Sequence, residues 1–303
     1  MTDSTETTAT PARTVRTRRI SLSYPEAELP RHYVSGDLVM SHVVTNLSAM
    51  FPEGEDFFVR SVRHYRDQIT DPELRRQVAG FIGQEAMHGR EHRSFNLRLG
   101  ELGYPTREVD RSVKWLFALG EKVLPASVQL AITAALEHYT ATLAEVLLTD
   151  PDARRMMDVD EVRSLFLWHA LEESEHKSVA FDVYQAACGN WRRRVIVMQA
   201  VTAGFGLAVV ASTVHSLLGD RATYRPARLV RSLGALRHSP FLRRNVARQL
   251  MAYNGRTFHP EDRDAEGMID VWRAELFGAE GSLTALLRSA EMDTSALAGS
   301  DAN

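Results

Sequence analysis

The sequence predicts an all-α protein built on four long helices, with additional helices toward the C-terminus. No stretch alternates apolar and polar residues as a half-buried strand would, whereas signals for helix starts and ends recur. Asp71-Pro72 and Asp150-Pro151 each join an N-cap residue to a proline at the first helical position, and Gly103 and Gly189 are typical of helix ends. Upstream of these signals, Pro52 and Gly54 predict a break. The long helices are therefore expected at about residues 55–69, 72–102, 125–149 and 152–188.

Composition places the chain among ordinary globular proteins. It has 303 residues, of which 44% are apolar and 25% charged, and the net charge of −3 gives no reason to expect a nucleic-acid partner. The single cysteine, Cys188, excludes internal disulfides and cysteine-based metal clusters. The N-terminus lacks the apolar run of a signal peptide, so a cytoplasmic location is expected. We expect a disordered tail at 1–30, a di-metal helical bundle at 31–190, an apolar and arginine-rich helical region at 191–285, and a second tail at 286–303.

Two Glu-x-x-His motifs stand on separate predicted helices. Glu85 and His88 lie one turn apart on one face of the second helix, among apolar neighbours. Glu173 and His176 repeat the spacing on the fourth helix, and His169 lies one turn before Glu173. Burying charged carboxylates in such surroundings is costly unless they are paired or bind a metal. One motif alone is weak evidence, but two on separate helices predict a metal site.

A two-metal bundle site needs one further carboxylate from each of the other two long helices. Glu137 lies in the middle of an otherwise apolar predicted helix. Glu55 precedes an apolar face, and we prefer it over Glu53 and Asp56 because its positions at i+3, i+7 and i+14 are apolar. The predicted ligands are Glu55, Glu85, His88, Glu137, His169, Glu173 and His176.

Four further residues lie close to this pattern without a settled role. His92 continues the stripe of His88 and is either a ligand, a supporting partner or an ordinary helix-face residue. Glu172 competes with Glu173, which has the motif spacing. Asp182 is either an acceptor that orients a ligand histidine or a surface carboxylate. Tyr184 lies on the stripe of His176, where a core position is the simpler interpretation and a redox or gating role is the other.

The motifs resemble those of a bacterial family known as predicted metal-dependent hydrolases. The resemblance rests on FPEGEDFFVRSVRHY, FIGQEAMHGREHRSFN, ALEHYTA and WHALEESEHKSVAFDVYQA, and on Arg256-Thr-Phe-His-Pro260 near the C-terminus. The ligand spacing is also similar to that of ferritin-like di-iron proteins, and the extra histidine at 169 to that of arylamine N-oxygenases. That second resemblance implies a ferritin-like four-helix bundle with two iron ions (or manganese), held by the seven ligands, and implies dioxygen activation.

From these features we expect a di-iron oxidoreductase or oxygenase that uses dioxygen on an apolar or amphipathic small molecule, with an electron-donor protein as a further partner. Two alternatives stay open. One is a two-metal hydrolase of an ester or phosphate, since a metal pair lowers the pKa of bound water. The other is a non-catalytic ferritin-like protein that handles iron. An oligomer is compatible with each of these.

The last third of the chain combines a long apolar run with many arginines. Residues 195–218 are nearly uninterrupted in apolar character and about as long as a membrane span. From 192 to 250 there are eleven arginines and one acid, a local charge of +10 that leaves −13 for the rest of the chain. This asymmetry fits an anionic membrane surface on the inner face of the membrane, contacted by a hairpin or a surface-lying helix. The alternative is a buried fifth bundle helix, with or without a tunnel for a lipid-like substrate.

Overall fold

The computed structural model describes residues 15–24 and 29–287, and this part of the chain is almost entirely helical. Within it there is no β-strand, only one isolated bridge between Ile20 and Leu287. The predicted all-α class is therefore confirmed. The expected tails fall partly outside the described residues, which exclude 1–14, 25–28 and 288–303.

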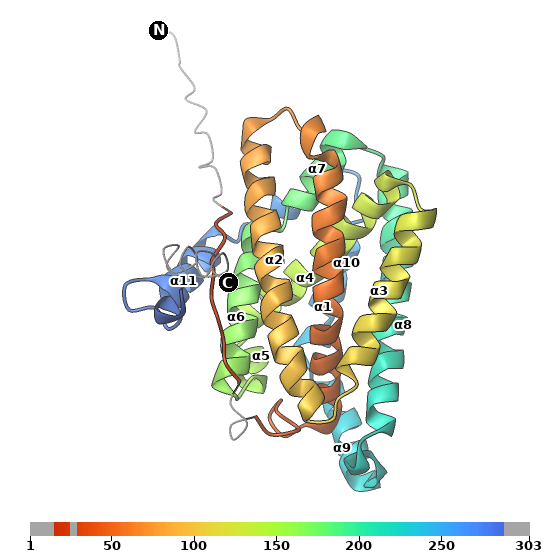
Figure 1. Cartoon of the computed structure of the whole chain (residues 1–303), viewed down its shortest axis with the longest axis vertical. Helices are drawn as coiled ribbons and strands as arrows, with labels where there is room; N and C mark the ends of the chain where they lie inside the picture. Colours follow the sequence, from red (N-terminus) through yellow and green to blue (C-terminus); the bar gives the residue numbers. More distant parts are fainter. Residues whose placement is uncertain (1–14, 25–28, 288–303) are drawn as a thin grey trace, which may run out of the picture.

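Four helices surround the interior of the molecule (Figure 1). Asp37 caps the first by accepting a hydrogen bond from the Met40 N–H, and Asp71 caps the second in the same way. The second helix contacts two separate apolar clusters, one through Phe81 and the other through Phe95. The polar residues between these two positions therefore form a layer of their own. The ferritin-like form of this bundle stays a prediction. The helices are α1 Leu38–Tyr65, α2 Pro72–Glu101, α4 Ala126–Thr149 and α6 Asp160–His176.

The predicted break at Pro52 is wrong, because α1 runs through it without interruption. Proline has no N–H to donate to the carbonyl four residues earlier, which here is that of Ser48. The side-chain amide of Asn96 on α2 donates to this Ser48 carbonyl at 2.9 Å instead. A neighbouring helix thus satisfies the acceptor that the proline leaves, and α1 continues unbroken from Leu38 past Glu55.

The predicted helix 152–188 is interrupted twice. The structure divides it into α5 (Pro151–Met156), α6 and α7 (Val179–Ala187). The second interruption, at Lys177 and Ser178, follows directly after His176, so residues on α7 no longer continue the face of α6.

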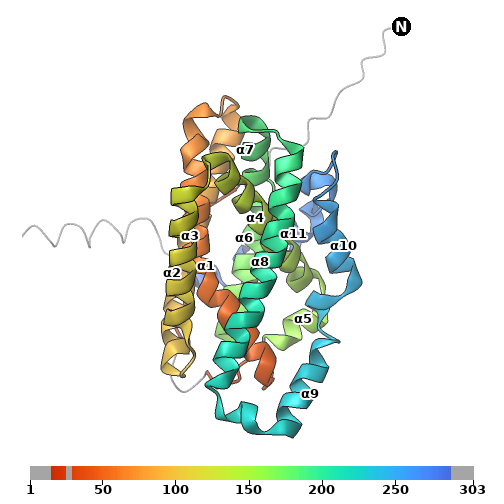
Figure 2. The same cartoon turned by 90° about the vertical axis from the view of Figure 1, so that its right-hand side faces the viewer.

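Most of the remaining helices lie outside this group of four (Figure 2), whereas α7 packs on α2 and α4 in the same apolar core. One of them, α3 (Thr106–Val123), fills a stretch in which we predicted no long helix, and it packs on α1. The apolar run forms one continuous helix, α8 (Trp191–Leu218), and not a hairpin. The C-terminal helices are α9 Pro226–Leu236, α10 Arg244–Ala252 and α11 Glu266–Phe277. Short 3₁₀ turns occur at Arg66–Gln68, Arg221–Tyr224, Pro240–Leu242, Pro260–Asp262 and Thr284–Leu286.

An N-terminal segment, residues 15–24, lies against α2 and α6 although we expected a tail there. Ile20 is fully buried, and the Leu22 N–H donates to the Glu91 carboxylate at 2.9 Å. The close approach requires glycine on α2: a Cβ at Gly83 would lie 2.0 Å from Thr17 Oγ1, and one at Gly80 only 2.1 Å from the Val15 carbonyl oxygen. The two glycines therefore make room for the N-terminal segment.

Candidate metal centre

The carboxylates and histidines of the two predicted motifs point into the polar layer between the apolar clusters. Glu85 and His88 are both buried on α2, and His169, Glu173 and His176 are buried along one face of α6. His169 Nε2 lies 3.0 Å from Glu173 Oε1, so one helix already brings an imidazole and a carboxylate into contact.

The two remaining carboxylates reach the same layer from α1 and α4. Glu55 is 2% exposed and Glu137 is 1% exposed, so both are inside the protein. The competitors of Glu55 point elsewhere, because Glu53 pairs with Lys114 at 3.3 Å and Asp56 pairs with Arg93 at 2.5 Å. At Gly89 on α2, a Cβ would lie 3.1 Å from Glu55 Oε2, so this glycine allows α1 and α2 to approach at the site.

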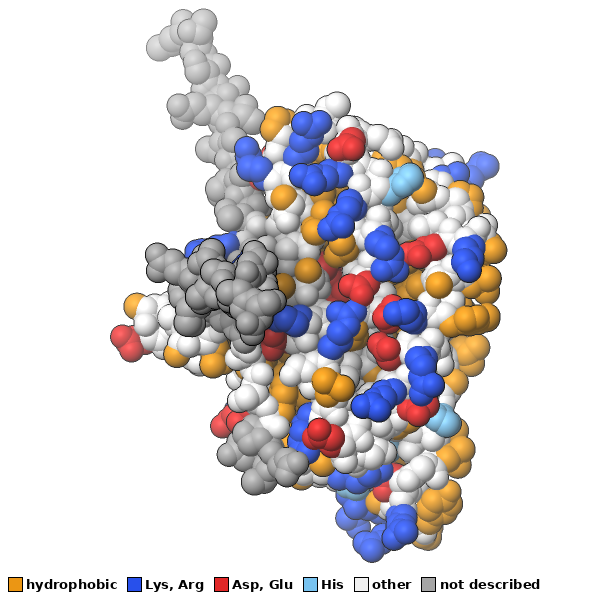
Figure 3. Space-filling view, viewed as in Figure 1, with side chains coloured by type: hydrophobic (Ala, Val, Ile, Leu, Met, Phe, Trp, Pro, Cys, Tyr) orange, Lys and Arg blue, Asp and Glu red, His pale blue; other side chains and the backbone are white. Residues whose placement is uncertain are grey.

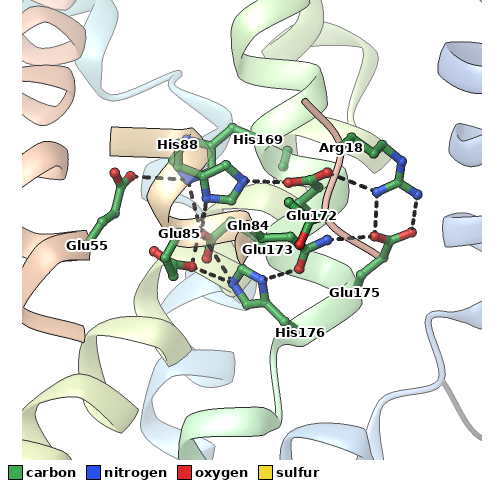
Figure 4. Close-up of polar contacts among 12 residues, drawn as sticks. Arg18, Glu55, Gln84, Glu85, His88, His169, Glu172, Glu173, Glu175 and His176 are labelled. Atoms are coloured by element: carbon green, nitrogen blue, oxygen red, sulfur yellow. Dashed lines mark hydrogen bonds and ion pairs between the residues drawn. The ribbon is translucent and has the colours of Figure 1, made fainter. Parts of the chain in front are cut away.

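All seven side chains meet across the four helices, and Figure 4 labels six of them, all except Glu137. His176 Nε2 lies 3.1 Å from Glu85 Oε1, 3.3 Å from Glu137 Oε2 and 3.5 Å from Glu173 Oε1. His88 Nδ1 lies 3.8 Å from Glu85 Oε1 and 3.7 Å from Glu173 Oε1, and His169 Nε2 lies 3.9 Å from Glu55 Oε1. Four groups of ligand atoms at the centre lie close enough to hold an ion. They are Glu55, Glu85 and His88; His88, His169 and Glu173; Glu85, Glu137 and His176; and Glu55, His92 and His169.

The site contains buried polar atoms that make no hydrogen bond of good geometry within the described part of the chain. Both carboxylate oxygens of Glu55, Glu85 and Glu137 are of this kind, and so are Glu173 Oε2, His88 Nδ1 and His176 Nε2. Leaving so many acceptors unsatisfied in an interior is strongly unfavourable. Their common direction fits positive ions between them, and the donor set of oxygen and imidazole nitrogen suits divalent metals.

The electrostatics of the ion-free site agree with this interpretation. Burial raises the pKa of Glu55 and of Glu85 well above the usual range, and repulsion from neighbouring carboxylates adds to the effect. Burial likewise raises the pKa of Glu137 to about 7. Burial lowers the pKa of His88 well below its usual value, which keeps the imidazole neutral as a metal ligand must be.

His88 and His176 each direct one ring nitrogen away from the centre, into a buried hydrogen-bond network. Most of this network was not predicted from the sequence. His88 Nε2 lies 3.1 Å from Glu172 Oε2. Glu172, which competed with Glu173 in the sequence, therefore contacts a predicted ligand histidine from its outward side. His176 Nδ1 lies 2.9 Å from Gln84 Oε1, and the Gln84 amide donates to Glu175 at 3.0 Å. Such contacts fix the orientation of a metal-binding imidazole.

Arg18 joins both arms of this network. From the N-terminal segment its guanidinium donates to Glu172 at 3.0 Å and to the two oxygens of Glu175 at 2.7 and 2.8 Å. Arg273 on α11 also donates to Glu175. The sequence interpretation missed Arg18 because an arginine in a Thr- and Arg-rich stretch carries no local signal of a partner 154 residues away. No pattern around Gln84 distinguished it either.

His92 contacts His169, the third histidine among the predicted ligands. Its Nε2 lies 2.7 Å from His169 Nδ1, and its Nδ1 lies 2.8 Å from Ser48 Oγ. Both nitrogens are therefore engaged, and His169 keeps Nε2 for the interior of the site. His92 also lies in a group with Glu55 and His169 that could hold an ion, so its role as a ligand or as a partner of His169 stays a prediction.

Asp182 and Tyr184 lie outside the centre. Asp182 pairs with His259 at 2.7 Å, and the Tyr184 hydroxyl donates to the Asn190 carbonyl. Their predicted positions assumed that the helix of His176 continues, and the interruption at Lys177 and Ser178 removes them from its face. The core interpretation of Tyr184 agrees with its complete burial.

A second group of potential ligands, His32, His42 and Asp220, lies where α1 meets the end of α8. Here Asp220 Oδ2 already contacts Arg31 at 3.0 Å, His32 at 2.9 Å and His42 at 3.2 Å. These contacts satisfy the carboxylate, so this group joins elements and does not resemble the unsatisfied centre above.

The family of the chain can now be stated. Residues 16–264, which are most of the chain, match the family described as predicted metal-dependent hydrolase, and the protein belongs to that family. No curated protein and no solved structure gave a match. The family match spans all seven predicted ligands and Arg18.

This assignment corrects the main functional expectation. A dioxygen-activating oxidoreductase is contradicted by a family described as predicted metal-dependent hydrolase. The wrong prediction has a physical cause. Clustered carboxylates and histidines indicate that cations bind, but the same donors occur in redox centres and in Lewis-acid centres, so they do not distinguish the two reactions. The family description supports the hydrolase alternative and the broader prediction that the protein is a metal-dependent enzyme.

Proposed function

We propose that the protein is a two-metal hydrolase that cleaves an ester or phosphate bond in a small-molecule substrate. The observation that carries the proposal is the set of unsatisfied, converging ligand atoms on four helices. The family description is the independent support. The non-catalytic iron-handling alternative has no such support.

The ligand groups suggest how two ions would be shared. Glu55, His88 and His169 would serve one ion, and Glu137 and His176 the other. Glu85 belongs to groups on both sides, and Glu173 Oε1 is near all three histidines, so these two carboxylates would lie between the ions. Oxygen and imidazole donors of this number suit iron or manganese.

When bound, such an ion pair supplies Lewis-acid activation of water and of the scissile group. The chain's own residues would position it and limit access. Phe81 packs edge-on against His176 with ring centroids 5.0 Å apart, and Trp168 packs edge-on against His88 at 4.9 Å. Phe51 packs in a tilted arrangement against His169 at 5.0 Å. These rings leave the histidines little rotational freedom and reduce the water around them, which strengthens electrostatic interactions within the site.

The test combines metal analysis with hydrolysis of two probe classes. Protein purified and reloaded with iron or manganese should contain about two ions per chain and hydrolyse p-nitrophenyl acetate or p-nitrophenyl phosphate. Glu137→Gln should lose at least one ion together with the activity. Glu145→Gln is the matched control, because Glu145 is a buried carboxylate on the same helix that pairs with Lys177 and Arg263 instead. Two bound ions without hydrolysis of either class would contradict the proposal, and so would normal metal content in Glu137→Gln.

A further inference from the structure

Helix α8 is apolar on its outer side as well as on much of its inner side, where Val197, Met198 and Leu217 are buried. Near its C-terminal end two small polar residues bind α1: Ser216 Oγ lies 2.6 Å from His42 Nδ1, and Thr213 Oγ1 lies 3.4 Å from the Asn46 amide. Its outer side is apolar along the full length. We call this side the α8 stripe, which comprises Ile196, Ala200, Ala203, Leu207, Val210, Val214 and Leu218.

The α8 stripe is fully accessible in the folded chain. Ile196 is 67% exposed, Leu207 69% and Val210 61%. By length and composition α8 could cross a membrane, and only 11% of its most apolar part is buried. The buried fifth helix that we considered as an alternative is therefore not what the structure shows. A normal surface helix directs its apolar residues inward, so this stripe indicates an external apolar environment.

The apolar surface extends beyond α8. Trp115, Leu116 and Leu119 on α3 are also exposed, and so is Leu233 on α9. Figure 3 shows hydrophobic side chains gathered along the right-hand edge of the molecule, where Figure 1 draws α3 and α8. At the lower end of that edge the side chains of lysine and arginine predominate.

The charges at both ends of the α8 stripe are of one sign. Arg192 lies at its start, and Arg221, Arg225 and Arg231 lie just beyond its end, all of them exposed. The single acid between residues 191 and 236 is Asp220, which is buried and held by Arg31. An anionic layer would meet cations at both ends of an apolar strip.

We propose that the α8 stripe binds the surface of a bilayer that contains anionic phospholipids. The stripe spans 22 residue steps, about 33 Å of helix, and would enter the apolar edge of the bilayer while the arginines contact the headgroups. The helix lies on the membrane and does not cross it, because its inner side remains bonded to α1 and packed on α4. A second copy fits less well, since facing stripes would bring arginine-rich ends together.

Binding to vesicles tests this inference independently of the hydrolase proposal. The full-length, metal-loaded protein should cosediment with vesicles of phosphatidylcholine and phosphatidylglycerol at low salt. It should bind vesicles of phosphatidylcholine alone at least tenfold more weakly, and binding to the anionic vesicles should fall at 0.5 M salt. Failure to bind anionic vesicles at low salt would overturn the inference, and equal binding to both vesicle types would overturn its anionic part.

Leu207→Glu places a charge at the centre of the α8 stripe and should reduce vesicle binding at least tenfold. Leu97→Glu is the matched control, because Leu97 is a 59% exposed leucine on α2. Circular dichroism and metal content should be unchanged in both variants, which separates binding from folding. Light scattering of the vesicle-free protein completes the test: a stable dimer that Leu207→Glu dissociates would assign the stripe to a second copy and overturn the inference.

Discussion

The metal centre and the α8 stripe are opposite exceptions to the usual distribution of residues. At the centre, four carboxylates and two histidines have buried atoms that make no hydrogen bond within the described part of the chain, whereas on the stripe apolar side chains are exposed. Without a further binding partner, each of these two regions would raise the free energy of the folded protein. The comparison teaches that both regions are shaped for something the chain does not supply, cations in the one and an apolar phase in the other.

Metal removal should have the largest effect and should act on the interior alone. At free concentrations a thousand times the dissociation constant, each bound ion stabilises the folded state by about 4 kcal/mol. Chelation should therefore lower the melting temperature by on the order of 10 °C or more. Calorimetry before and after chelation measures this, and the same melting temperature in both states would show that the centre needs no ions.

Removal of Arg18 should come next. Arg18→Ala leaves Glu172 and Glu175 without their buried cation, a loss that costs about 3–5 kcal/mol in comparable pairs. Because this network orients His88 and His176, metal affinity should also fall by about 10–100-fold. Denaturant unfolding and a metal-competition titration measure the two effects. Arg16→Ala, two residues earlier and exposed, should change neither; an equal loss there would refute the role of Arg18.

A pair of glycine substitutions should have opposite signs in the two regions. Gly83→Ala would force Thr17 and the N-terminal segment away from α2, at a cost of about 1–3 kcal/mol. Gly204→Ala on α8 has no atom within 4 Å of the new Cβ and should gain up to about 1 kcal/mol from helix propensity. Unfolding free energies of both variants test the contrast. Stabilisation by Gly83→Ala would mean that the segment is not held as described.

The smallest effect concerns pH and the attachment of the C-terminal region to α7. The hydrogen bond with Asp182 raises the pKa of His259 above its usual value. Its folded-state pKa is thus above the unfolded one, so the stabilisation is complete below about pH 6.5 and is lost as pH rises through the folded value. Both side chains are partly exposed, so the change should stay under about 1 kcal/mol.

Unfolding midpoints at pH 6 and pH 8.5 measure this difference for the wild type and for His259→Gln. The variant should lose the extra stability at pH 6. His64→Gln, at an exposed position on α1, should retain it. A wild-type midpoint that rises toward pH 8.5 by the same amount in all three proteins would contradict the assignment to His259.

Local sequence patterns predicted the helices that carry the centre. They did not predict contacts between segments that are distant in the sequence. Spacing at i+3 and i+4 placed Glu85 with His88 and His169 with Glu173, because one helix fixes those geometries by itself. The continuity of α1 through Pro52 depends on Asn96 of another helix, which no local rule contains. The predicted helix 152–188 was wrong in its continuity, since the chain leaves the helix at Lys177 and Ser178, whereas the core position preferred for Tyr184 agrees with its burial.

The substrate chemistry was missed for a different reason. The residues of the centre define which charges are held and where, and the same donors suit several reactions. Iron or manganese as the bound metals, and the seven ligands as a complete set, therefore stay predictions until metal content is measured.

The contact of Arg18 with α6 has a consequence for how the protein is made. Arg18 leaves the ribosome before its partners, which follow 154 and 157 residues later. The guanidinium must therefore wait in water while α1, α2 and α4 are synthesised, and the buried network closes only after α6 has been completed. A chain that starts at residue 31 would keep every predicted ligand and still lack this closing contact, so the position of an N-terminal fusion or truncation would decide how well the centre is assembled.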